Sequence, residues 1–174
     1  EVIGISMIKN MLHKYTCLVL LLVFFSCSNN EVRKNDSNIQ QIEVPIFNSD
    51  SAYSYIEKQV SFGPRFLSSK GWSLCSEYLE EKLRLYTPNV IIQRAPVTTY
   101  DGKDHVLRNI IASFSPEKNN RIVFFAHWDT RHVADYDTLN TNQPILGAND
   151  GGSGVGVLLE VARQLSLKSP RVGV

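Results

Sequence analysis

Two short polar segments contain the residue types that are best suited to chemistry. His127 and Asp129 follow directly on the apolar run 122–126, and Asp150 lies within the glycine-rich run 147–154. Imidazole and carboxylate groups are ligands that zinc accepts. His127 and Asp150 are therefore candidate metal ligands. Asp129 could accept the second ring N–H of His127 and so fix the orientation of the imidazole.

Each candidate also has a simpler interpretation. His127 could be a surface histidine at a strand end, and Asp150 or Ser153 could cap the helix that follows. The glycine-rich run could bind phosphate, but it lacks both the Lys-Ser/Thr ending of a P-loop and the spacing of a dinucleotide motif. Trp128 could help to wall a substrate pocket or could belong to the core.

The spacing of apolar residues predicts the elements that hold these side chains. Three helices and an antiparallel hairpin are expected, the helices at 52–60, 70–86 and 155–165 and the strands at 90–100 and 105–114. The run 122–126 has no polar alternation, which predicts a central strand covered on both faces. Strands and helices in this order predict an α/β fold, in which ligands gather at the carboxyl ends of the strands.

Length and composition fit a globular domain. The chain has 174 residues, of which 43% are hydrophobic and 20% charged. Its 18 Lys and Arg against 17 Asp and Glu leave no basic excess, so we expect no nucleic-acid partner. Cys75 would be the one cysteine of the folded part, which leaves no internal disulfide, and it is expected in the core.

Residues 1–27 predict an export signal. Its pattern begins at Met7, and six residues precede this methionine. Basic residues are followed by the apolar run 18–25, which is too short to span a bilayer. Cys27 then stands where bacterial lipoproteins are acylated. Residues 28–47 predict a flexible tether. We expect an exported protein, lipid-anchored in the bacterial envelope, that contacts the membrane only through this segment; a cleaved signal or an uncleaved anchor is the alternative.

The two polar segments together resemble one superfamily. Residues 126–131 and 147–155 are similar to the two-part motif of the superfamily that unites glutaminyl cyclases with zinc aminopeptidases. Residues 62–65 and 109–112 resemble its upstream segments. The resemblance covers about 51–174 and implies a three-layer α/β/α sandwich with a mixed central sheet. Residues 48–174 would be the N-terminal part of this catalytic domain, truncated after the first metal-ligand helix.

The resemblance also implies roles for individual residues. Asp150 would be a zinc ligand in either branch of the superfamily. In the two-zinc aminopeptidases His127 is a ligand too and Asp150 bridges the metals, whereas in the one-zinc cyclases His127 and Asp129 support the site. The segment most resembles bacterial cyclases, although His132 stands where that branch usually has proline. The acid/base carboxylate and further ligands would lie beyond Val174, so no catalytic residue is assigned and the fragment itself is expected to be inactive.

These observations predict a zinc-dependent glutaminyl-peptide cyclotransferase. Such an enzyme converts the N-terminal glutamine of a peptide to pyroglutamate and releases ammonia. The first alternative is a two-zinc aminopeptidase, which would remove the first residue of a peptide. The second alternative is a non-catalytic surface lipoprotein with the same fold.

Overall fold

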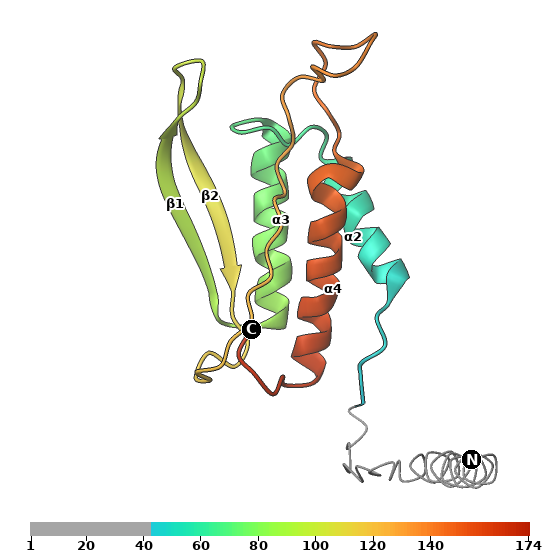
Figure 1. Ribbon diagram of the computed structural model, residues 1–174, viewed down its shortest axis with the longest axis vertical. Coiled ribbons are helices and arrows are strands. Elements are labelled where there is room, and N and C mark those ends of the chain that lie inside the picture. The colour runs from blue at the N-terminus through green and yellow to red at the C-terminus, as the bar shows by residue number, and fades with distance from the viewer. Residues whose placement is uncertain (1–42) are drawn as a thin grey trace, which may run out of the picture. The chain divides into compact units, whose positions relative to one another are not determined.

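The computed structural model describes residues 43–174, so the predicted signal 1–27 and residues 28–42 of the predicted tether lie outside the described part. Six elements follow in chain order (Figure 1), namely α2 (Ser49–Ser61), α3 (Lys70–Tyr86), β1 (Val90–Thr98), β2 (Asp104–Ala112), η1 (Ala148–Ser153) and α4 (Gly154–Leu167). The predicted α/β class is confirmed. Within residues 43–174, every helix is too short or too polar to cross a membrane.

Local capping explains where the first two helices begin. The backbone N–H of Ser51 donates to Asn48 Oδ1 at 2.9 Å, and that of Trp72 donates to Ser69 Oγ at 3.0 Å. Each bond satisfies an N–H in the first turn that has no partner within the helix. The helices predicted at 52–60, 70–86 and 155–165 are all confirmed, with bounds that differ by three residues or fewer.

The core lies among the three long helices. Figure 1 shows α4 between α3 and α2, and α4 contacts both of them. Buried apolar side chains from all three helices meet there, namely Tyr55, Cys75, Leu79, Val155 and Leu159. The predicted core position of Cys75 is therefore confirmed.

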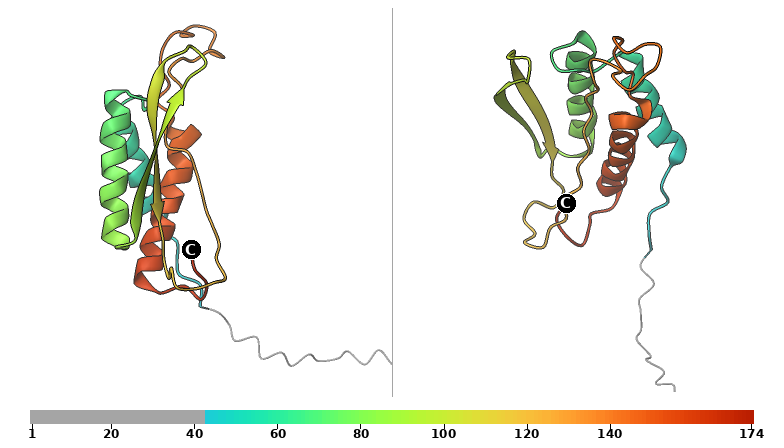
Figure 2. Two further views of the ribbon diagram at one scale, coloured as in Figure 1. Left: turned by 90° about the vertical axis from the view of Figure 1, so that its left-hand side faces the viewer. Right: turned by 45° about the horizontal axis from the view of Figure 1, so that its top comes forward.

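The predicted hairpin is present. β1 and β2 pair antiparallel from Val90 opposite Ala112 to Thr98 opposite Asp104. The turn between them contains Gly102, whose φ of 76° is in the left-handed region that favours glycine. The hairpin lies against α3 (Figure 2), with both strands in contact with that helix.

The prediction of a buried central strand at 122–126 is wrong for the described part of the chain. The segment is extended but pairs only at its start, through a parallel bridge between Arg121 and Gly173. The side chain of Phe125 is 90% exposed. A buried strand needs hydrogen-bonded neighbours and covering layers, and residues 43–174 supply neither along this run. Residues 43–174 form two parts of the predicted mixed sheet, namely the antiparallel pair of β1 and β2 and the parallel bridge between Arg121 and Gly173.

Candidate functional site

The structure brings the three polar candidates together. His127 Nε2 lies 3.0 Å from Asp150 Oδ1. On the other side of the ring, His127 Nδ1 lies 3.1 Å from the carbonyl oxygen of Asp129 and 3.6 Å from its Oδ1. All three side chains are more than half exposed. A ligand arriving from solvent can therefore reach them.

The imidazole of His127 has an oxygen atom beside each of its nitrogens. When Nδ1 donates to the Asp129 carbonyl, Nε2 of the neutral ring presents a lone pair to Asp150 Oδ1. Either a proton shared by the two atoms, in which case His127 supports the carboxylate, or a metal ion bound by both would satisfy these two lone pairs. Two ligands of one tetrahedral zinc ion are roughly 3.3 Å apart, which is close to the separation of these atoms. The donor set thus fits zinc.

His127 and Asp150 by themselves would not complete a metal site. Among residues 43–174, no three His, Cys, Asp or Glu side chains are grouped closely enough to hold a metal ion. Protein zinc sites typically have three or four protein ligands. The described residues therefore supply a ligand pair, and its role in metal binding stays a prediction.

Two glycines allow the loop that carries Asp150 to approach the segment that carries His127. Gly147 and Gly151 have φ values of 58° and 89°. A Cβ at Gly151 would lie 2.9 Å from the carbonyl oxygen of Asp129 and 3.2 Å from Nδ1 of His127. A Cβ at Gly147 would lie 2.4 Å from a methyl carbon of Thr130. Any other residue at either position would push the two segments apart.

The simpler interpretation of Ser153 as a helix cap is wrong. Ser153 is the residue before α4, but its side chain makes no capping bond there. Its hydroxyl instead donates to the carbonyl oxygen of Asn149 at 2.7 Å. The carboxylate of Asp150 contacts the His127 ring, which leaves it directed at the candidate site.

Trp128 lies against the core. Its ring stacks on that of Trp72, with 5.3 Å between the centroids and 29° between the planes. It also packs on the apolar cluster between the helices. Trp128 therefore lies at the core, which is one of the two positions that the sequence allowed for it. Its part in a substrate pocket stays a prediction.

Arg65 belongs to the site, although the sequence singled it out only as part of a family segment. Its side chain is fully buried, and its guanidinium donates to the carbonyl oxygens of Trp128, Leu146 and Gly147. No local pattern distinguishes an arginine that will be buried from one that stays in solvent. The one sequence signal for a special role of Arg65 was its position directly after Gly63 and Pro64.

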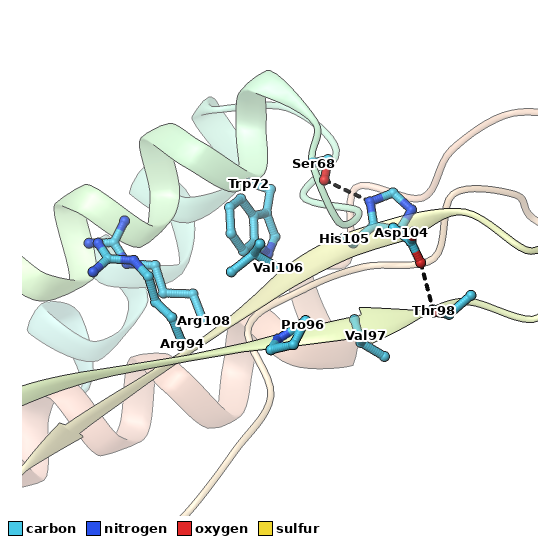
Figure 3. Close-up of a pocket in the computed structure, with 10 residues that line it drawn as sticks. All are labelled: Ser68, Trp72, Arg94, Pro96, Val97, Thr98, Asp104, His105, Val106 and Arg108. Carbon is cyan, nitrogen blue, oxygen red and sulfur yellow. Dashed lines mark hydrogen bonds between the residues drawn. The ribbon is translucent and has the colours of Figure 1, made fainter.

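A hollow of about 870 Å³ lies elsewhere, between α3 and the hairpin (Figure 3). Trp72, Arg94, His105 and Arg108 are among its lining residues. Ser68 Oγ and His105 Nδ1 are 2.8 Å apart at one end. None of the candidate metal ligands lines this hollow.

Comparison with known proteins finds one matching family model and several similar solved structures. Residues 109–174 match the family model of Peptidase family M28. A glutaminyl cyclase from Tannerella forsythia is 49% identical, with a TM-score of 0.72 over 74% of this chain. A glutaminyl cyclase from Bacteroides thetaiotaomicron bound to N-acetylhistamine is also 49% identical, with a TM-score of 0.73 over 75% of this chain.

A Zn-dependent exopeptidase from Parabacteroides distasonis is 47% identical, with a TM-score of 0.73 over 75% of this chain. These matches are all to M28 peptidases, Zn-dependent exopeptidases or glutaminyl cyclases, which are the proteins of the superfamily that the sequence motifs predicted. The predicted superfamily is thereby confirmed. The chain spans 45%, 46% and 46% of the lengths of these three structures, in the order given.

Proposed function

We propose that the protein is a zinc-dependent glutaminyl-peptide cyclotransferase that acts on peptides with N-terminal glutamine. The observation that carries the proposal is the pair formed by His127 Nε2 and Asp150 Oδ1, 3.0 Å apart and open to solvent. The 49% identity to two solved glutaminyl cyclases supports cyclisation as the reaction.

Each residue of the pair then has a defined task. Asp150 would hold a single zinc ion, and His127 would hold the Asp150 carboxylate in place while Asp129 orients the His127 ring. When bound, a zinc ion there would supply Lewis-acid chemistry at the side-chain amide carbonyl of the substrate. The proton must pass from the α-amine of the substrate to the departing ammonia, which requires a general acid/base. We assign no residue among 43–174 to that transfer.

The experiment uses the protein expressed from its complete reading frame. It is incubated with zinc and a peptide that begins with glutamine, and the peptide is followed by mass spectrometry. Loss of one ammonia supports the cyclase. Asp150→Asn is expected to abolish the reaction, whereas Asp101→Asn, in the exposed hairpin turn, is expected to leave it unchanged. An unmodified peptide would refute the proposal.

A two-zinc aminopeptidase is the second candidate. It is favoured by the way His127 Nε2 faces Asp150, since both groups could then bind metal. The similarity to an exopeptidase described as Zn-dependent supports it as well. Two zinc ions per chain, with release of the whole first residue of the peptide, would establish this candidate. A chain that binds no zinc and alters no peptide would be the non-catalytic lipoprotein.

Lipid anchoring is a separate proposal and rests on Cys27, which lies outside the described residues. In a bacterial host, labelled palmitate should be incorporated into the protein and lost in Cys27→Ser. Cys75→Ser is the matched control, since Cys75 is buried among the helices and should leave the label in place. Label that persists in Cys27→Ser would refute acylation at this residue.

A further inference from the structure

Arg65 is the largest fully buried side chain among the described residues. Its three guanidinium nitrogens donate to backbone carbonyl oxygens: Nε to Trp128 at 3.0 Å, Nη1 to Leu146 at 2.8 Å and Nη2 to Gly147 at 2.8 Å. Removing the cation from water lowers the pKa of Arg65 from its ordinary value. The fold thus buries a charge that is costly to desolvate and satisfies it with carbonyl groups.

These carbonyl groups come from the two segments that carry the candidate ligands. Trp128 stands between His127 and Asp129. Leu146 and Gly147 directly precede η1, which contains Asp150. One planar guanidinium therefore binds both segments at once, close to the point where His127 and Asp150 meet.

The backbone of Arg65 strengthens the link to the first segment. Its N–H donates to Thr130 Oγ1 at 2.9 Å, and its carbonyl oxygen accepts from the N–H of Thr130 at 3.2 Å. The rigid fork of a guanidinium holds its acceptors at fixed relative positions, which a lysine ammonium cannot do. A change at Arg65 would therefore alter how the two segments are placed relative to each other.

We propose that Arg65 is a positioning residue that sets the separation of His127 Nε2 and Asp150 Oδ1 and thereby the zinc affinity of the site. The inference rests on the proposed function, because it takes this pair to be part of the zinc site. Groups that orient metal ligands without touching the metal typically contribute about 10-fold to 100-fold in affinity.

Zinc affinity tests the proposal directly. The protein from the complete reading frame is titrated with Zn²⁺ in competition with a chromophoric chelator, and folding is checked by circular dichroism. Arg65→Met is expected to weaken zinc binding about 10-fold to 100-fold, with Arg65→Lys between it and the wild type. Arg108→Met is the matched control. Arg108, in β2, is mostly buried and binds Ser76 and Glu80 of α3, so this change should destabilise the protein but alter zinc affinity less than about twofold.

The outcomes separate the inference from the proposed function. A wild-type protein that binds no zinc refutes both. A wild-type protein that binds zinc, beside a folded Arg65→Met that binds it equally well, refutes only the role of Arg65. If Arg65→Met does not fold, Thr130→Val decides, because it removes the hydroxyl that accepts from Arg65 and keeps the guanidinium. It should weaken zinc binding about threefold to tenfold, and unchanged binding would overturn the proposal.

Discussion

Replacing Gly151 with alanine should damage the candidate site and the stability of the fold together. Gly151 has a φ of 89°, which costs a residue with a side chain about 1–2 kcal/mol. The added Cβ would lie 2.9 Å from the Asp129 carbonyl oxygen and 3.2 Å from the His127 ring. Relieving such overpacking costs about 1–3 kcal/mol more. We therefore expect Gly151→Ala to lower the free energy of unfolding by about 2–5 kcal/mol.

Gly102→Ala is the matched control for backbone strain. Gly102 has a similar φ of 76°, but a Cβ there would meet no atom within 4 Å. It should lose only the strain energy of about 1–2 kcal/mol and bind zinc like the wild type. Urea denaturation measures the stability of both variants, and competition with a chelator measures their zinc affinity.

The contact with the site distinguishes the two variants. Gly151→Ala should weaken zinc binding at least about tenfold, since His127 and Asp129 must move to admit the Cβ. Equal losses of stability in Gly151→Ala and Gly102→Ala, with unchanged zinc affinity in both, would refute the argument that this close approach builds the site.

Three further predictions concern the fold. Leu159→Ala should lower the free energy of unfolding by about 3–4 kcal/mol because Leu159 is 2% exposed, whereas Leu85→Ala, at 72% exposure, should change it by less than about 0.5 kcal/mol; urea denaturation measures both. Hydrogen bonds from Arg163 lower the pKa of the buried Glu160 to about 2, which is below its value in the unfolded chain. The ionised Glu160 should therefore contribute about 3 kcal/mol to the free energy of unfolding at neutral pH, and this contribution should be lost as the pH falls from about 5 to 2. Denaturation curves of Glu160→Gln should lack that part of the pH dependence. Burial raises the pKa of Cys75 to about 12, so peptide mass spectrometry should find it alkylated by iodoacetamide only after unfolding.

The helices and the hairpin could be predicted from the sequence because their signals are local. Asn48 and Ser69 cap the first two helices with bonds that span three residues. The apolar faces repeat at the helical period, and the turn at Asp101-Gly102 joins two β-rich runs. Such patterns depend on near neighbours in the chain, so they persist whatever the remainder of the fold does.

Tertiary structure decided the surroundings of each element. The run 122–126 has the composition of a buried strand, yet burial depends on partners that the run itself does not contain. The sequence indicated His127, Asp129 and Asp150 by type and spacing, but the contact between His127 and Asp150 exists only because the chain folds two distant segments together. Arg65 shows the same dependence most clearly, since its burial and its carbonyl partners follow from packing between segments that no local pattern connects.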